Sequence, residues 1–124
     1  MNVVDSSGWI EYFLQGGNAA FFIPPIRDVE NLLVPSICIY EVCKRLLADV
    51  GEEAALQAVG VMLQGQEIPI ERTIAIEAAR LSRDLKLGMA DSLIYATARA
   101  HHATLWTQDE HFGGLEGVKY IPKR

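Results

Sequence analysis

Residues 1–10 read MNVVDSSGWI: a short apolar run, an aspartate, two serines and a glycine. The pattern predicts a short buried strand over residues 2–4, followed by a helix that Ser6 or Ser7 can cap. Between strand and helix lies Asp5, with no lysine or arginine in the next ten positions. Asp5 could itself cap the helix, although the two serines could do so in its place. The stretch therefore predicts a strand that ends on a carboxylate without a nearby counter-charge.

The same alternation of apolar strand patterns and helical patterns continues along the chain. Apolar residues at helical spacing follow most of the short apolar runs, and glycines or prolines separate the segments. Ser36 is expected to cap a helix, Pro25 to begin a short one, and Gly88 to end a long one. The expected strands are 2–4, 32–35, 67–70, 103–106 and 118–122, and the expected helices are 8–15, 25–31, 37–50, 52–65, 73–87 and 90–102.

This order predicts an α/β fold of three layers, α/β/α, with a central and mostly parallel sheet covered by helices on both faces. In such folds, ligands bind beyond the carboxyl ends of the strands. Asp5 lies at such an end. We find no linker or repeat, and we expect residues 1–124 to form a single domain.

Composition limits the possible functions. The formal net charge is −5, which is unusual for a protein that binds nucleic acid through surface lysines and arginines. No segment resembles a signal peptide or a membrane span, so we expect a cytoplasmic protein without membrane contact. Only two cysteines are present, Cys38 and Cys43, and their spacing favours free thiols over a disulfide or a zinc site.

Three further acids are expected near Asp5. Asp109 follows the strand pattern at 103–106 as Asp5 follows the first strand, so both carboxylates should leave the same edge of a parallel sheet. Glu41 lies in the first two turns of the helix after the second strand, and Asp91 opens an almost wholly apolar helix.

Each of these acids also has an ordinary structural explanation. Asp91 could be a helix cap, and Asp109 could cap a turn. Glu41 could pair with Lys44 or Arg45 on the same helix. As a group they are harder to explain in this way, because clustered carboxylates repel one another and stay ionised only beside a cation. Oxygen ligands without thiolates favour Mg²⁺ or Mn²⁺, and ions held in this way typically act on phosphates.

The sequence resembles a known family at these four positions. The segments VVDSSGWIEYF, SICIYEVCKRL, MADSLIYATA and LWTQDEHF resemble the four acidic motifs of PIN-domain ribonucleases, and the chain length resembles that of the VapC toxins of toxin–antitoxin pairs. The resemblance covers nearly the whole chain in the correct order. It implies a Mg²⁺- or Mn²⁺-dependent endoribonuclease with one or two ions. Its metal-binding and catalytic acids would be Asp5, Glu41, Asp91 and Asp109.

The resemblance also assigns supporting residues. Ser6 and Thr107 match hydroxyl positions beside these acids and would orient a carboxylate or a metal-bound water. Some relatives carry a further acid where this chain has His111, which leaves the number of ions open. Glu110 is a possible substitute ligand. We expect His111 to pack or face solvent, with a place near the scissile phosphate as the alternative.

The implied partners are an RNA substrate, a cognate antitoxin whose basic side chain enters the acidic pocket, and a second copy of the chain. The competing hypothesis is a non-catalytic PIN-fold scaffold that binds proteins. Metal binding separates the two, because an ion that binds only the folded state raises the melting temperature.

Overall fold

The computed structural model describes residues 1–124 and contains five strands, six α-helices and two short 3₁₀-helices, here labelled η. In chain order they are β1 (Asn2–Val4), α1 (Ser6–Phe13), α2 (Ala19–Arg27), η1 (Val29–Asn31), β2 (Leu32–Pro35), α3 (Ser36–Asp49), α4 (Glu52–Met62), β3 (Gln66–Ile68), α5 (Arg72–Leu85), α6 (Met89–Ala100), β4 (Thr104–Thr107), η2 (Glu110–Phe112) and β5 (Val118–Tyr120).

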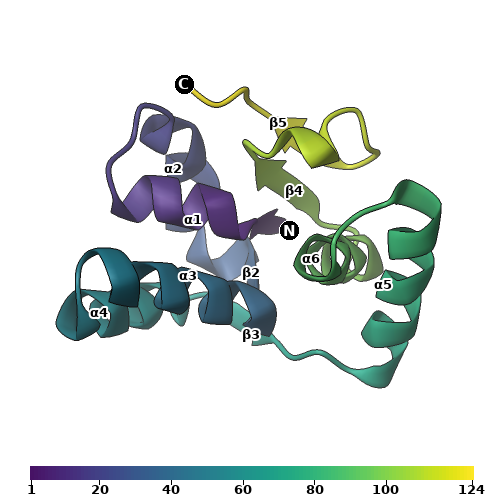
Figure 1. Ribbon diagram of the computed structural model, residues 1–124, viewed down its shortest axis with the longest axis horizontal. Coiled ribbons are helices and arrows are strands. Elements are labelled where there is room, and N and C mark those ends of the chain that lie inside the picture. Colours follow the sequence, from purple (N-terminus) through teal and green to yellow (C-terminus); the bar gives the residue numbers. More distant parts are fainter.

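The strands form one parallel sheet in the order β3-β2-β1-β4-β5. Val3 of the central strand β1 pairs with Leu33 of β2 on one side and with Leu105 of β4 on the other. Figure 1 shows α1, α3 and α4 on one side of the strands and the α5–α6 pair on the other. The predicted α/β class and parallel sheet are confirmed. Because the chain order reverses its direction across the sheet at β1, the carboxyl ends of β1 and β4 border the crevice where ligands of such folds bind.

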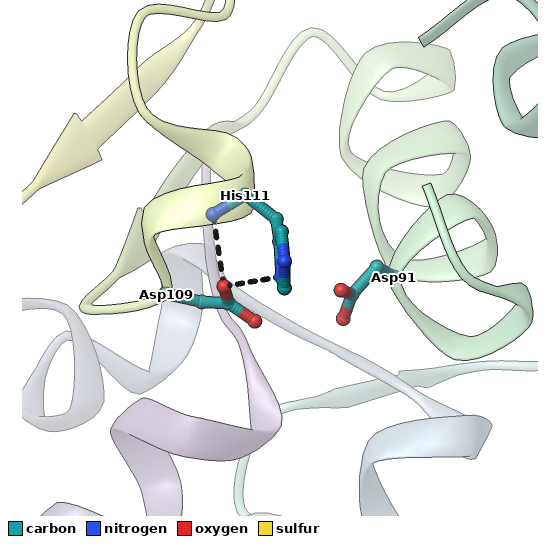
Figure 2. A group of neighbouring side chains, drawn as sticks. All are labelled: Asp91, Asp109 and His111. Carbon is teal, nitrogen blue, oxygen red and sulfur yellow. Dashed lines mark hydrogen bonds and ion pairs between the residues drawn. The ribbon is translucent and has the colours of Figure 1, made fainter. Parts of the chain in front are cut away.

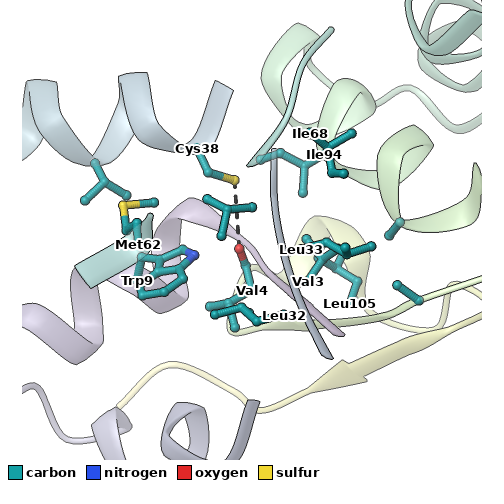
Figure 3. Close-up of a cluster of buried hydrophobic side chains, with 14 of the residues drawn as sticks. Val3, Val4, Trp9, Leu32, Leu33, Cys38, Met62, Ile68, Ile94 and Leu105 are labelled. Atoms are coloured by element: carbon teal, nitrogen blue, oxygen red, sulfur yellow. Dashed lines mark hydrogen bonds between the residues drawn. The ribbon is translucent and has the colours of Figure 1, made fainter. Parts of the chain in front are cut away.

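A single contiguous apolar cluster joins the sheet to the helices on both faces (Figure 3). Val3 and Leu105 of the sheet are fully buried, as are Trp9 of α1 and Met62 of α4. Burying each of these large side chains stabilises the fold by about 1.5–3 kcal/mol. Cys38 is also buried and lies 3.8 Å from the Val4 carbonyl oxygen, and both cysteines are free as expected.

The structure corrects three expected helix starts. Of the alternatives for capping α1, Asp5 is the cap and Ser6 and Ser7 are not; its carboxylate accepts a hydrogen bond from the Gly8 N–H. Ser36 is the first residue of α3 and makes no capping bond; its hydroxyl donates to Glu67 of β3 instead.

The third helix start concerns the proline pair. The helix expected from Pro25 begins earlier, at Ala19, and includes Pro24 and Pro25. Fully buried Phe22 anchors α2 against α1, so tertiary packing outweighs the backbone bonds that the prolines remove.

Two boundaries in the second half also differ. The expected strand 67–70 is observed at Gln66–Ile68, because Pro69 cannot donate a ladder bond. Helix α5 ends at Leu85, and its C-cap is Lys86, which has a left-handed φ of 58°. Gly88, expected to end this helix, is instead the N-cap of α6. None of the helices combines the length and apolar character needed to cross a membrane.

Candidate metal centre

The four predicted carboxylates line one pocket of about 470 Å³ at the carboxyl edge of the sheet. They come from four different places: the ends of β1 and β4, the second turn of α3 and the first turn of α6. The structure therefore brings together side chains that lie up to about a hundred residues apart in sequence, as parallel strands with helical crossovers require. These four acids are Asp5, Glu41, Asp91 and Asp109.

Asp5 is the most enclosed acid, with only 2% of its surface exposed. Its Oδ1 accepts from the Gly8 N–H at 2.8 Å, and its Oδ2 accepts from the Thr107 hydroxyl at 2.6 Å. The Ser7 hydroxyl lies 2.8 and 2.9 Å from the two oxygens. Burial raises the pKa of Asp5 to about 6, although these three hydrogen bonds act in the opposite direction. The carboxylate is thus held rigidly in a site that disfavours its charge.

Glu41 is fixed by a contact between helices. Its Oε1 accepts from the Ser6 hydroxyl at 2.6 Å, which joins α3 to the first residue of α1. The alternative of an ion pair with Lys44 or Arg45 is wrong, because Arg45 pairs with Asp49 at 2.7 Å and the Lys44 ammonium lies over the Tyr40 ring. Glu41 is therefore oriented toward the pocket instead of into solvent along its own helix.

Asp91 has no hydrogen bond or ion pair from its side chain. It is the third residue of α6 and half-buried, and Gly88 is the N-cap, so the helix-cap explanation is wrong. Burial first, and then the charges of Asp109 and Glu41, raise its pKa to about 6, while His111 acts in the opposite direction. A carboxylate that faces a pocket without a protein partner has its oxygens available to a ligand.

Asp109 lines the pocket, and His111 lies next to it in the lining of the neighbouring hollow. Asp109 caps η2 by accepting from the His111 N–H, and His111 Nδ1 lies 2.9 Å from Asp109 Oδ1. The turn-capping explanation for Asp109 is therefore correct, and it coexists with a place in the pocket. Figure 2 shows the His111 side chain projecting from η2 into the space between Asp109 and Asp91 of α6. Ligand atoms of Asp91, Asp109 and His111 all lie within 4.8 Å of one another, so one ion could contact all three.

The charge of the pocket is strongly one-sided. Glu11 adds a fifth acid to the lining, and only Arg45 and Lys123 are basic. Arg45 is engaged by Asp49. After burial, the nearby carboxylates Asp109 and Glu41 are the next causes of the raised pKa of Asp91. A cation bound in the pocket would lower this pKa. Carboxylate oxygens fit Mg²⁺ or Mn²⁺, and the imidazole of His111 suits Mn²⁺ better than Mg²⁺.

The residues expected to support the acids match their predicted roles only in part. Ser6 and Thr107 both donate to carboxylates of the pocket, at Glu41 and Asp5 respectively. The expectation that His111 simply packs or faces solvent is incomplete, because its side chain is 70% exposed yet bonded to Asp109. Glu110 is exposed and lines a neighbouring hollow instead of the acidic pocket.

Sequence reasoning missed a buried polar link behind the site. Asn18 Nδ2 donates to Gln108 Oε1 and to the Pro122 carbonyl oxygen, both at 2.9 Å. This link positions the chain around Lys123, which lines the pocket. An asparagine in the α1–α2 turn gave no sequence signal of such a role, because its partners lie 90 and 104 residues away.

Comparison with known proteins adds a family assignment. Residues 3–117 match the family model described as the PIN domain. No curated protein sequence matches the chain.

Several solved structures share the fold. A toxin–antitoxin complex from Klebsiella pneumoniae superposes with a TM-score of 0.82 at 22% identity, covering 96% of both chains. VapC20 of Mycobacterium tuberculosis, a toxin that cleaves the sarcin–ricin loop, has a TM-score of 0.79 at 15% identity, over 95% of this chain and 97% of that one. DNA-bound VapBC from Salmonella typhimurium has a TM-score of 0.74 at 14% identity, over 98% of both chains. At these identities the similarity establishes a common fold.

Proposed function

The chain belongs to the PIN domain family, and we propose that it is a metal-dependent endoribonuclease whose single domain, residues 1–124, hydrolyses phosphodiester bonds in RNA. The observation that carries this proposal is the set of four carboxylates around one pocket, where Asp91 has no protein partner. Such a set is costly for the fold unless a cation binds, because two of its members have a raised pKa.

The residues fit a hard divalent cation, Mg²⁺ or Mn²⁺. Asp91, Asp109 and His111 would hold one ion, since their ligand atoms already lie close together. Asp5 and Glu41 line the same pocket as Asp91 and Asp109 and could contribute oxygens to this ion or to a second one. When bound, such ions lower the pKa of a coordinated water and stabilise the leaving oxygen of the phosphodiester.

The chain's own residues would supply orientation. Thr107 and Ser7 fix the direction of the Asp5 carboxylate, and Ser6 fixes that of Glu41. Hydrogen bonds to metal ligands of this kind commonly contribute about 10–100-fold to metal affinity or activity. His111 would hold Asp109 in place while offering its second ring nitrogen to the pocket.

We further propose that the protein is the toxin of a toxin–antitoxin pair in the cytoplasm. The similar solved structures include a toxin–antitoxin complex and VapC20, which supports this biological role. An apolar groove of about 300 Å³ between α1, α3 and α4 shares Leu14 with the acidic pocket. An antitoxin helix could bury apolar side chains there and place a basic residue among the carboxylates, where it would replace the cation.

A homodimer is also part of this proposal. Tyr40 and Leu47 of α3 are exposed by 59% and 47% on the same helix, which is apolar surface that a second copy could cover.

The test is cleavage of total RNA by the purified chain in Mg²⁺ or Mn²⁺. We expect discrete fragments that disappear in EDTA and with Asp91→Asn, and whose mapped ends identify the RNA target. Asp84→Asn is the matched control, because Asp84 is an exposed acid of α5 outside the pocket. Equal fragments from wild type and Asp91→Asn would assign the cleavage to a contaminant. A melting temperature unchanged by millimolar Mg²⁺ and Mn²⁺ would favour the non-catalytic scaffold.

A further inference from the structure

A second hollow of about 430 Å³ adjoins the acidic pocket. The two share Gln108, Asp109 and Lys123 in their linings, so they meet along the end of β4 and the C-terminal segment. Tyr120 of β5 lines only the second hollow, which we call the Tyr120 groove. A chain-like substrate with its reactive bond at Asp109 could therefore continue from the acidic pocket into the Tyr120 groove.

Lys123 lies where the two hollows meet and is exposed. It forms no ion pair, whereas the other basic residue of the acidic pocket, Arg45, is bonded to Asp49. The two residues before Lys123 are anchored, because the Ile121 N–H donates to the Thr107 carbonyl at 3.0 Å and Asn18 donates to the Pro122 carbonyl. An available cation is thus held beside a cluster of acids, where it can bind an anion such as a phosphate group.

Tyr120 offers an aromatic surface in the hollow that Asp109 also lines. It pairs in register with Thr107, the residue whose hydroxyl bonds Asp5. The side chain is 39% exposed and packs against no other aromatic ring, in contrast to Trp106, which contacts Phe21 and Lys119. An exposed ring beside a free lysine matches the pairing of base stacking and phosphate contact by which proteins hold single-stranded nucleic acid.

We propose that the Tyr120 groove binds a nucleotide that flanks the scissile phosphate, with its base stacked on Tyr120 and a phosphate contacted by Lys123. This inference rests on the proposed ribonuclease function and adds residues that recognise the substrate. Only one of its seven lining residues is hydrophobic, and Lys123 lies in this lining beside the acids Asp109 and Glu110, so the groove suits a polar nucleotide better than an apolar peptide segment. The groove between α1, α3 and α4, in which seven of eight lining residues are hydrophobic, is the better site for an apolar helix.

The test is steady-state cleavage of a short RNA that spans the mapped cut site. We expect Tyr120→Thr and Lys123→Gln each to lower kcat/KM about tenfold, mainly by raising KM, and Tyr120→Phe to keep most of the activity. Threonine retains the strand preference of tyrosine without its ring. Arg27→Gln, at an exposed basic residue that ends α2 and lines neither hollow, serves as the matched control. The melting temperature of each variant identifies any loss of folding.

A second measurement isolates the stacking contact. A single abasic nucleotide is moved along the RNA, and at one position flanking the cut it should lower kcat/KM in wild type but cause no further loss in Tyr120→Thr. Additive losses at every position would overturn the stacking contact. If wild type cleaves and both groove variants keep the wild-type kcat/KM, the groove assignment is wrong while the ribonuclease stands. If Tyr120→Thr changed inhibition by the antitoxin but left kcat/KM unchanged, nucleotide binding in the groove would also be overturned. The groove would then be assigned to the protein partner.

Discussion

The Thr107 hydroxyl donates to Asp5 Oδ2 at 2.6 Å, across 102 positions of sequence, and accepts from the Asp109 N–H at 2.9 Å. One hydroxyl group therefore contacts the carboxylate of one acid of the pocket and the backbone of another, at the ends of the neighbouring strands β1 and β4. Thr107 is fully buried, so neither bond competes with water. This side chain thus links the Asp5 carboxylate to the backbone that carries Asp109.

Replacing Thr107 by valine or by serine should show what its hydroxyl contributes to stability and to activity. Thr107→Val keeps the volume but removes both bonds, and it should lower the free energy of unfolding by about 1–3 kcal/mol. It should also raise the pKa of Asp5 further, since the Thr107 bond is the largest influence that lowers it. Thr107→Ser retains the hydroxyl and should preserve activity better than Thr107→Val. Denaturant unfolding and RNA cleavage measure the two effects, and equal activity of both variants would contradict the role of the hydroxyl.

The raised pKa values predict how stability depends on pH without metal. The pKa of Asp5 and that of Asp91 rise from 3.8 to about 6 on folding. Below the unfolded pKa of 3.8, the contribution of these two groups to the free energy of unfolding is fully present. It is lost as the pH rises from there through the folded pKa of about 6, because the unfolded chain loses these protons more easily than the folded one. In EDTA, Asp91→Asn should therefore raise the melting temperature above pH 6 by roughly 5 °C, and this gain should shrink toward about pH 4. Asp84→Asn, outside the pocket, is the control that should show no such trend.

His111 should influence which ion the protein prefers. Its imidazole, together with two carboxylates, suits Mn²⁺ better than an all-oxygen set does. The melting temperature of wild type should rise more with Mn²⁺ than with equal Mg²⁺. His111→Ala should weaken Mn²⁺ binding about tenfold, or about 1.4 kcal/mol. His111→Asp should shift the preference toward Mg²⁺. If Mn²⁺ raised the melting temperature of wild type, His111→Ala and His111→Asp by the same amount, and Mg²⁺ likewise, His111 would be excluded as a ligand.

The sheet and the clustering of the acids could be predicted because each depends on local pattern. Apolar runs such as Leu32–Pro35 mark the strands, and parallel order alone places Asp5 and Asp109 on one edge. The exact boundaries depended on packing that local pattern does not record. Pro24 and Pro25 lie inside α2 because Phe22 is held in the core.

The supporting bonds of the site could not be predicted for a related reason. Ser6 reaches Glu41 only because α1 packs on α3, and the sequence suggested partners for Glu41 on its own helix instead. Asn18 links Gln108 and Pro122 through the close approach of three loops. Such contacts depend on tertiary geometry, and no residue spacing signals them.

The Ser6–Glu41 bond should affect catalysis more than folding. Ser6→Ala removes a 2.6 Å hydrogen bond and leaves Glu41 free to turn away from the pocket. We expect a loss of about tenfold or more in cleavage, with a smaller relative change in stability because Glu41 is only half-buried. Ser36→Ala is a suitable control, because its hydroxyl also bonds a glutamate of another element but lies outside the pocket. Equal cleavage by the two variants would show that Glu41 needs no support from α1.

Gly8 connects the packing of the core with the geometry of the metal centre. A Cβ at this position would lie 2.5 Å from the Phe22 ring and 2.8 Å from Val4 Cγ1, so α1 would have to move away from α2 and β1. The Gly8 N–H holds Asp5 Oδ1, and the same movement would displace that carboxylate. Gly8→Ala should cost about 1–3 kcal/mol of stability and reduce cleavage as well.

Gly60 provides the matched comparison. It lies in the exposed part of α4 with open space where a Cβ would be, so Gly60→Ala should stabilise the protein by about 0.5–1 kcal/mol. Urea unfolding of both variants, with cleavage measured at a temperature where both are folded, separates stability from geometry. If Gly8→Ala lost stability but cleaved as well as wild type, Asp5 would not depend on the position of α1, and its bond to Thr107 would be sufficient to hold it.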